Sequence, residues 1–453
     1  MSQTRRAVLG RLGLVLTIGA VASCAATRAS GDDPDEPAIT ASPTAAAPDP
    51  TSAAASIPMV TTPSTAAPEK GPPPPAVPTP RRTTTSTTAP PTTTTSPVER
   101  ADWAVFDYVL SDRLIGGGDQ AASVAVAIDG TIVHRAAFGQ RVPGERAQPR
   151  NRFRIASISK PMAAAAALRL VEAGRLELDR PALPLVATLL DVPVADRRAN
   201  TITVRQLLGH TSGFGNFEFE LFYAGSGSCH QAAGIALSEP LAGEPGKSYR
   251  YSNMNYCLIG LVLEAVTGRP FEAVIRQQVL EPVGAEAMRV AGTGDVGKRD
   301  VLHVTSAGRN YMDTLGASGS WISSASDVVR FADSLDPAKA GWHPLSNESL
   351  ALMKTPARRK DNDNDNDRDR VRDRDRDKDN DREPGAPWYG LGLMVYPDGS
   401  FGHTGTLENT HAMTIVRPDG VTWAVLVSGE NPWQSSDLRA IVDGALFAAL
   451  ART

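Results

Sequence analysis

The sequence is organised around residues 154–160, which read RIASISK. Ser157 and Lys160 stand three residues apart there, a spacing that places two side chains on one face of a helix. The following segment, 161–174, contains an alanine run and two leucines and ends at a glycine, as expected of a helix with a glycine stop. We therefore predict that Ser157 lies in the first turn of a helix, with the Lys160 amine beside its hydroxyl.

This arrangement would make Ser157 a nucleophile. The amine can take the proton of the hydroxyl, and the free N–H groups at the start of a helix favour a developing oxyanion. The spacing alone is weak evidence, because a serine that caps a helix beside a solvated lysine gives the same pattern. Ser159 is a second candidate by residue type, but it adjoins Lys160 and does not face it on a helix.

The length and charge of the chain limit its function. Its 453 residues carry a formal net charge of −4, which gives no reason to expect a nucleic-acid partner. Residues 101–453 are enough for one large domain or two closely packed lobes. The sequence indicates no set of metal ligands, and we expect neither a metal nor a cofactor.

Residues 1–24 are predicted to be a lipoprotein signal peptide. Arg5 and Arg6 precede an apolar run that is too short to span a membrane comfortably. The run ends in Val-Ala-Ser-Cys, which resembles the lipobox of bacterial lipoproteins and implies cleavage before Cys24 and lipidation of its thiol. The arginine pair also resembles a twin-arginine signal, so the export route stays open. An uncleaved signal anchor is the alternative.

Two low-complexity segments are predicted to be disordered. Residues 25–100 are rich in Thr, Ser, Ala and Pro, with too little apolar surface to offset the entropy of ordering, and we interpret them as a semi-rigid tether. Residues 359–383 alternate Asp with Asn, Arg or Lys. Their start resembles a calcium loop, but Asn366 and Arg372 stand where an EF-hand needs Gly and Glu. A solvated charged insertion is the better interpretation.

The hydrophobic pattern predicts an α+β fold. Strands bounded by turn residues are expected at 121–128, 131–138, 388–396, 413–417 and 421–428. Helices are expected near both ends, at 103–110 and 436–450, and in the middle, at about 256–266 and after an N-cap at Ser326. The sequence therefore predicts an antiparallel β-sheet flanked by N- and C-terminal helices, with a helix-rich lobe formed by the middle of the chain.

Three motifs stand in chain order, namely Ser157-x-x-Lys160, Tyr251-x-Asn253 and His403-Thr404-Gly405. Each is weak alone, but their order, spacing and setting are specific together. They resemble the Ser-x-x-Lys, Ser-Asp-Asn and Lys-Thr-Gly signature of the serine β-lactamase and penicillin-binding-protein superfamily. The resemblance is strongest to its class C β-lactamase, DD-carboxypeptidase and esterase branch. It covers residues 101–453 apart from the charged insertion.

The resemblance implies a role for each motif. Ser157 would attack a carbonyl to form an acyl-enzyme, with Lys160 in reach of its hydroxyl. The Lys160 ammonium would favour the Tyr251 phenolate, so that Tyr251 could act as general base and then pass the proton to the leaving group. Asn253 would hydrogen-bond the substrate and Lys160. The other implied groups are the N–H groups of Ser157 and Thr406 in an oxyanion hole, and His403 and Thr404 beside a substrate carboxylate or the phenol.

His403 departs from the superfamily signature, which has a lysine at this position. A lysine is a permanent cation that suits a carboxylate such as that of a penicillin, whereas histidine is mostly neutral near pH 7. The difference argues against a specialised β-lactamase and favours a peptidase or an esterase. We interpret another histidine, His210, as a side chain that ties down a loop beside the site rather than as a catalytic group.

Cys229 and Cys257 are the two cysteines that remain once Cys24 is lipidated. Disulfides persist in exported proteins, so we predict that these two cysteines pair. Two free buried thiols are the alternative.

The sequence leaves two functions open. The first is an exported, lipid-anchored serine hydrolase on the outer face of the bacterial cell membrane, whose small acyl substrate is a cell-wall peptide, a β-lactam or an ester. The second is a catalytically silent lipoprotein that binds the cell wall through the same fold. Retention of the polar residues of all three motifs favours the hydrolase.

Overall fold

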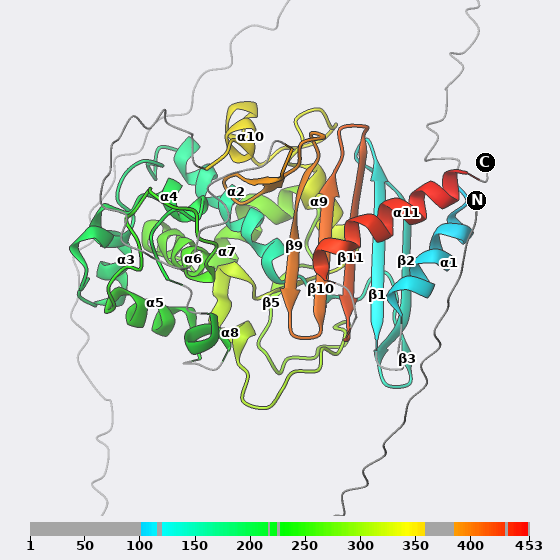
Figure 1. Ribbon diagram of the computed structural model, residues 1–453, viewed down its shortest axis with the longest axis horizontal. Helices are drawn as coiled ribbons and strands as arrows, with labels where there is room; N and C mark the ends of the chain where they lie inside the picture. The colour runs from blue at the N-terminus through cyan, green and yellow to red at the C-terminus, as the bar shows by residue number, and fades with distance from the viewer. Residues whose placement is uncertain are drawn as a thin grey trace, which may run out of the picture. The chain divides into compact units, whose positions relative to one another are not determined.

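An antiparallel sheet joins the two ends of the folded chain in the computed structural model (Figure 1). Among the described residues this sheet has eight strands. In spatial order they are β3 (Glu145–Arg146), β2 (Thr131–Val142), β1 (Ala121–Ile128), β11 (Val421–Ser428), β10 (Thr410–Val416), β9 (Phe401–Leu407), β8 (Met394–Val395) and β7 (Trp388–Tyr389). The junction between the early and late parts of the chain is the β1–β11 pair, whose register runs from Ala121 opposite Ser428 to Ile128 opposite Val421.

The structure describes residues 101–115, 120–215, 218–223, 227–357, 385–430 and 434–451. All of them belong to one compact unit, Ala89–Thr453. The predicted signal peptide with Cys24, the tether at 25–100 and the charged insertion at 359–383 lie outside the described residues.

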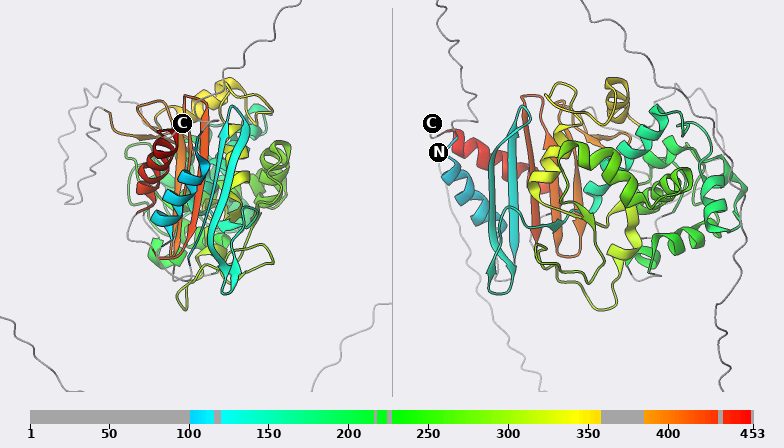
Figure 2. Two further views of the ribbon diagram at one scale, coloured as in Figure 1. Left: turned by 90° about the vertical axis from the view of Figure 1, so that its right-hand side faces the viewer. Right: turned by 180° about the vertical axis from the view of Figure 1, so that it is seen from behind.

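Both faces of the sheet are covered, which explains why every residue of β1 is buried although the strand is antiparallel. Alternate residues of a strand point to opposite faces. Val124 and Val126 therefore pack in the cluster that includes α1 (Trp103–Leu114) and α11 (Leu438–Leu450). Ala125 and Ala127 belong to the larger cluster on the other face. Figure 2 shows α1 and α11 side by side on one face of the sheet.

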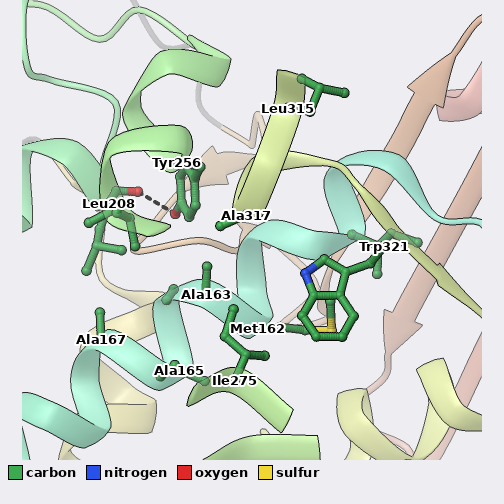
Figure 3. Packing of buried hydrophobic residues seen from close by; sticks show 14 of the residues in the cluster. Met162, Ala163, Ala165, Ala167, Leu208, Tyr256, Ile275, Leu315, Ala317 and Trp321 are labelled. Atoms are coloured by element: carbon green, nitrogen blue, oxygen red, sulfur yellow. Dashed lines mark hydrogen bonds between the residues drawn. The ribbon is translucent and has the colours of Figure 1, made fainter. Parts of the chain in front are cut away.

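The middle of the chain forms a helix-rich lobe, as predicted. The described α-helices between β4 and β7 in the chain are α2 (Ser159–Glu172), α3 (Leu183–Leu190), α4 (Val204–Leu208), α5 (Cys229–Leu237), α6 (Asn253–Thr267), α7 (Phe271–Ile275), α8 (Tyr311–Leu315), α9 (Ala325–Asp333) and α10 (Asn347–Lys354), of which α9 packs on the large sheet. The alanine run of α2 is entirely buried, and its small side chains let neighbouring elements approach closely, including Tyr256 of α6 and Ala317 (Figure 3). The predicted α+β architecture, with terminal helices on an antiparallel sheet, is confirmed.

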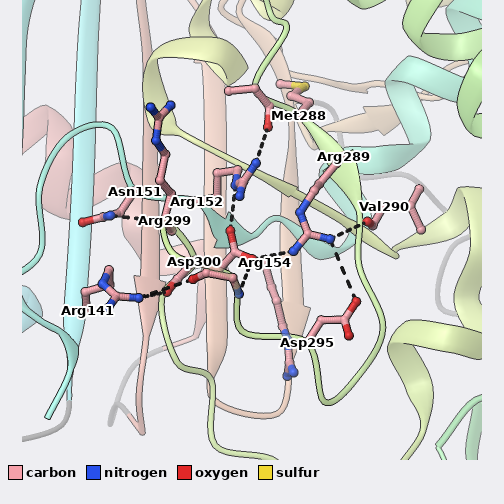
Figure 4. Close-up of polar contacts among 12 residues, drawn as sticks. Arg141, Asn151, Arg152, Arg154, Met288, Arg289, Val290, Asp295, Arg299 and Asp300 are labelled. Atoms are coloured by element: carbon pink, nitrogen blue, oxygen red, sulfur yellow. Dashed lines mark hydrogen bonds and ion pairs between the residues drawn. The ribbon is translucent and has the colours of Figure 1, made fainter.

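A second sheet of three short strands leads into the segment quoted at the outset. Its order among the described residues is β4 (Phe153–Arg154), β6 (Trp321–Ser323) and β5 (Arg289–Val290). The loop that follows β5 is fixed by Asp300, which accepts from Arg152 Nε at 2.7 Å and also pairs with Arg289 (Figure 4). Burial alone would raise the pKa of Asp300, but hydrogen bonds from Arg289, the Gly297 N–H and Arg152 outweigh it and lower that pKa. This network holds the strand that precedes Ser157.

Several predicted element boundaries were wrong by a few residues. Helix α2 begins at Ser159, so that Ser157 lies in a preceding 3-10 turn, Ala156–Ile158, rather than in the α-helix itself. Helix α6 begins at Asn253 rather than near residue 256. The strand predicted at 388–396 is two short strands, β7 and β8.

The predicted N-cap of α9 was also wrong. Ser324, rather than Ser326, caps this helix, because the Ser324 hydroxyl accepts from the backbone N–H of Asp327. Within the described ranges, we find no helix with the length and apolar character needed to cross a bilayer.

Candidate active site

Ser157 lies on a strained turn between β4 and α2. Ala156, directly before it, has a φ of 47°, a left-handed conformation that is uncommon for a residue with a Cβ. The Ser157 side chain remains partly exposed. Ser159, the other candidate nucleophile, is fully buried, and its hydroxyl donates to the carbonyl oxygen of Ala156 at 2.6 Å. The turn therefore presents Ser157 and uses Ser159 to stabilise its own backbone.

Lys160 is fully buried beside Ser157. Its Nζ atom lies 2.9 Å from Ser157 Oγ, 2.7 Å from Asn253 Oδ1 and 3.0 Å from the carbonyl oxygen of Ser318. Amide and carbonyl oxygens can only accept. Asn253 and Ser318 can therefore take both N–H groups of a neutral amine, which leaves its lone pair for the Ser157 proton. A third N–H of the ammonium can instead donate to Ser157 once that proton has been transferred.

Tyr251 reaches the same place from the segment before α6. Lys160 Nζ lies 4.9 Å from the centroid of the Tyr251 ring, a cation–π distance. Asn253 is the first residue of α6, whose N-cap Ser252 accepts from the N–H of Met254. The start of α6 thus places Tyr251 and Asn253 on either side of its cap and beside the buried amine.

Strand β9 supplies the third motif and passes beside the turn that carries Ser157. A Cβ added to Gly405 would lie 2.2 Å from the carbonyl oxygen of Ile155 and 3.2 Å from Ala156 Cβ. Only a glycine lets the strand approach the turn this closely. The neighbouring Thr406 is exposed, and its hydroxyl donates to Ser435 Oγ at 2.6 Å.

His403 is buried, and its side chain contacts the phenol of Tyr389 rather than that of Tyr251. Its Nε2 atom lies 3.0 Å from the hydroxyl of Tyr389, and its Nδ1 atom 2.5 Å from the carbonyl oxygen of Thr404. The Tyr251 ring centroid is 6.5 Å away. Because a carbonyl can only accept, Nδ1 carries the proton and Tyr389 donates to Nε2. Burial and the nearby charge of Lys160 lower the pKa of His403 to about 3, so its imidazole is neutral at physiological pH.

Three contributors to the site were missed from the sequence. The carbonyl of Ser318 leaves no side-chain signal, and Tyr389 lies on a strand of only two residues. The Ser435 hydroxyl donates to the Gly405 carbonyl at 3.0 Å and so ties the end of the chain to β9. Thr404 was predicted to face substrate or phenol, and in the structure its Oγ1 atom is 3.7 Å from Met394 Sδ.

Cys229 and Cys257 form a disulfide with an S–S distance of 2.14 Å. The bond joins the first residue of α5 to α6, one turn below Asn253. Of the two alternatives that the sequence left open, the structure contains the paired form. For metal binding, a search of the described residues finds no group of three or more His, Cys, Asp or Glu side chains that could hold an ion.

Substitution of Gly405 by alanine should lower both stability and kcat. The added Cβ would overlap the Ile155 carbonyl, so β9 or the Ser157 turn must shift. We expect a loss of about 1–3 kcal/mol in the free energy of unfolding and a fall of about 10²-fold in kcat for ester hydrolysis, because small displacements of reacting groups have such effects.

Gly402→Ala is the matched control for this prediction. A Cβ at Gly402 would lie 1.9 Å from the Thr414 carbonyl oxygen, which is a comparable overlap on the same strand but not with the nucleophile turn. Urea unfolding and steady-state kinetics on both variants separate the two effects. An equal loss of kcat in the two variants would contradict a specific role for the Gly405 approach.

The three motifs therefore meet at one place, with a serine hydroxyl, a buried amine and a phenol around it. Residues 107–446 match the Beta-lactamase family, which is more than half of the chain. The chain belongs to the Beta-lactamase family. Its membership agrees with the superfamily resemblance that the motifs indicated.

Two curated relatives show the range of this family. The chain is 34% identical over 203 residues to the esterase EstB of Burkholderia gladioli, an alignment that covers 40% of this chain and 48% of the esterase. It is 28% identical over 278 residues to penicillin-binding protein 4 of Amycolatopsis lactamdurans, covering 57% and 70% of the two chains. The match thus spans about half the length of the esterase.

Among solved structures, the D-amino acid amidase of Ochrobactrum anthropi SV3 is similar in fold. Its TM-score is 0.57 at 20% identity, with 79% of this chain and 99% of the amidase covered. The penicillin-binding protein homologue from Pyrococcus abyssi gives a TM-score of 0.58 at 21% identity, with 76% and 77% covered. Both agree with the sheet and lobe described above.

Proposed function

We propose that this protein is a serine hydrolase that forms an acyl-enzyme at Ser157. The observation that carries the proposal is the position of Lys160, whose buried Nζ atom lies 2.9 Å from Ser157 Oγ while Asn253 and Ser318 accept its other hydrogen bonds. These contacts hold the buried amine within hydrogen-bond reach of the Ser157 hydroxyl. Membership of the Beta-lactamase family supports the same assignment.

The reaction follows from these contacts. As Ser157 Oγ attacks the substrate carbonyl, its proton passes to Lys160 Nζ where that amine is neutral, or to the Tyr251 phenolate where Lys160 is the ammonium. The backbone N–H groups of Ser157 and Thr406 then stabilise the oxyanion by hydrogen bonds. Collapse of the intermediate breaks the bond to the leaving group, which takes the proton back. Water then attacks the acyl-enzyme by the same steps and restores the Ser157 hydroxyl.

The substrate class that we favour is an ester or amide without a carboxylate beside the reacting carbonyl. The third motif supplies a neutral imidazole instead of a lysine, because the pKa of His403 is lowered to about 3. Its Nδ1 proton and Nε2 lone pair are both engaged, by Thr404 and by Tyr389. An electrostatic partner for a penicillin or peptide carboxylate is therefore missing at this position. The similarity to an esterase supports the ester.

The test compares substrates and labels the nucleophile. We expect the purified protein to hydrolyse a short p-nitrophenyl ester faster than a chromogenic cephalosporin or a D-Ala-D-Ala peptide. A fluorophosphonate should label the peptide that contains Ser157, and Ser157→Ala should remove both label and turnover. A folded protein that hydrolyses none of the three substrates and is not labelled would contradict the proposal. The catalytically silent binding protein would then be the better interpretation.

Export and lipid anchoring at Cys24 are part of the proposal. Support comes from the lipobox resemblance and from the Cys229–Cys257 disulfide, which suits an oxidising compartment outside the cytoplasm. Mass spectrometry of the N-terminal peptide from a membrane fraction should find a lipidated Cys24, and Cys24→Ser should release the protein. An unmodified N-terminus would contradict the anchor without affecting the hydrolase assignment.

A further inference from the structure

His210 holds the chain on both sides of Tyr251. Its Nδ1 atom accepts from the backbone N–H of Ser252 at 3.2 Å, and its carbonyl oxygen accepts from the N–H of Arg250 at 2.8 Å. The residues immediately before and after Tyr251 are thus both bound to His210. The Asn255 side-chain amide lies 3.0 Å from the same Nδ1 atom and fixes the ring from α6.

The His210 ring also packs against the phenol itself. Its centroid lies 4.3 Å from that of Tyr251 and 4.8 Å from that of Tyr389, and the ring of Tyr256 is 5.2 Å away. The histidine is therefore enclosed by aromatic rings and is fully buried. The His210 ring therefore packs directly against the ring of Tyr251, the candidate general base.

The protonation of His210 is fixed by its partners. Because a backbone N–H donates to Nδ1, the imidazole proton is on Nε2. Within the described part of the chain, Nε2 is buried and has no hydrogen-bond partner. Such orphaned groups are rare in folded proteins.

The backbone at His210 is strained as well. Its φ is 56°, in the left-handed region that a residue with a Cβ seldom occupies. Strain together with an unpaired buried N–H costs stability. A loop that only needed to be tied down could use a less costly side chain, so these costs point to a role at the site.

We propose that His210 is a positioning residue for Tyr251, and that it sets the phenol against the Lys160 amine through its contacts with Arg250, Ser252 and the Tyr251 ring. The inference rests on the proposed function, since it concerns the orientation of the proposed base. His210 itself does not touch the reacting atoms. Its imidazole is neutral near pH 7, because burial and the nearby charge of Lys160 lower its pKa well below 6.5.

The test uses two substitutions of His210, one that keeps an aromatic ring and one that keeps a hydrogen-bond acceptor. His210→Phe keeps a ring but loses the Nδ1 acceptor, whereas His210→Asn keeps an acceptor at that distance and tolerates a positive φ. We expect His210→Phe to lower kcat for a p-nitrophenyl ester by about 10²-fold with KM changed little. His210→Asn should lose less than about tenfold, a partial rescue that a mere space-filling role would not give.

A double-mutant cycle identifies the residue through which His210 acts. If it acts through Tyr251, then His210→Phe should have almost no further effect in a Tyr251→Phe background. The control is His134→Phe, because the His134 ring also stacks on an aromatic ring, that of Trp103 at 4.4 Å, but between α1 and β2. That variant should keep the parent kcat.

Two kinetic outcomes overturn the inference. One is an unchanged kcat in folded His210→Phe, and the other is a loss of equal size with and without Tyr251. A readout that needs no turnover separates this failure from failure of the proposed function. The NMR ring signal of Tyr251, assigned by its disappearance in Tyr251→Phe, should shift in both His210 variants, and an unshifted signal would refute positioning even in an inactive protein.

Discussion

Replacement of Lys160 by methionine should lower kcat for ester hydrolysis by about 10³-fold, within the range for loss of a general base. Methionine keeps the approximate length of the side chain but has no amine to take the Ser157 proton. The effect should appear in kcat and in kcat/KM alike, because the lost interaction acts in the transition state. Steady-state kinetics and the rate of fluorophosphonate labelling at Ser157 measure it.

Stability must be measured alongside, because Lys160 is also a buried donor. Its removal takes away the hydrogen bond that Asn253 Oδ1 and the Ser318 carbonyl each receive from Nζ. A buried acceptor left unsatisfied costs about 1–3 kcal/mol. Kinetics should therefore be recorded at a temperature where circular dichroism shows the variant folded.

The matched control is Lys354→Met. The Nζ atom of Lys354 lies 3.8 Å from the centroid of the Phe401 ring, and burial lowers the pKa of this lysine. It is thus another lysine packed in the protein, but it belongs to α10 rather than to the site. We expect its kcat to stay within about threefold of the parent. A folded Lys160→Met variant with near-parent kcat would overturn the role assigned to the amine.

The spacing of Ser157 and Lys160 was informative because it is local. An interval of three residues specifies one face of a helix whatever the tertiary structure, and the structure places the two side-chain atoms 2.9 Å apart. The start of the helix was misjudged, although Pro161 marked it. Proline is favoured in the first turn, where its missing N–H has no partner to lose, and α2 begins two residues before it.

The contacts that the sequence did not reveal are long-range or made by the backbone. Tyr389 meets His403 only because β7, β8 and β9 are adjacent strands, and no pattern within a strand of two residues indicates that pairing. Ser318 contributes a carbonyl, which every residue has. By contrast, the N-cap of α9 had a readable signal, since Ser324 stands three residues before Asp327 in a capping pattern.

The free energy of unfolding should fall as the pH drops below about 6.5, because the folded protein buries three histidines in their neutral form. Burial comes first among the causes that lower the pKa of His210, His303 and His403. The positive charge of Lys160 adds to it for His210 and His403, and that of Arg154 for His303. For His403 the lowered pKa is about 3.

The direction of this pH dependence follows from the number of protons that each state binds. Below 6.5 the unfolded chain protonates these histidines while the folded protein does not, so the unfolded state binds more protons and is favoured as the pH falls. Each histidine contributes a slope of about 1.4 kcal/mol per pH unit, or about 4 kcal/mol for three, until the folded form titrates. Urea unfolding at several pH values between 7.5 and 5 measures the slope.

His303→Asn isolates one of these histidines. In the parent, His303 Nε2 accepts from the backbone N–H of Arg154 at 3.1 Å, and its Nδ1 atom lies 2.8 Å from Thr410 Oγ1. Both ring nitrogens therefore have hydrogen-bond partners while the imidazole is neutral. The variant should be less stable than the parent at pH 7.5, but its slope should be smaller by about 1.4 kcal/mol per pH unit. Burial raises the pKa of Asp327 and Asp333, so these two carboxyls change the stability in the opposite sense. Their contribution is the same in the parent and the variant and cancels when the two slopes are compared.

His230→Asn is the contrasting control for the pH dependence. A hydrogen bond from His230 to Glu264 raises the pKa of this exposed histidine, so its stabilising contribution is complete below 6.5 and is lost only as the pH rises through its folded pKa. Its removal should leave the slope between pH 6 and 5 unchanged to within about 0.3 kcal/mol per pH unit. If His303→Asn left that slope equally unchanged, burial of neutral histidines would not be the cause of the acid sensitivity, and the protonation states assigned to His210 and His403 would lose their support.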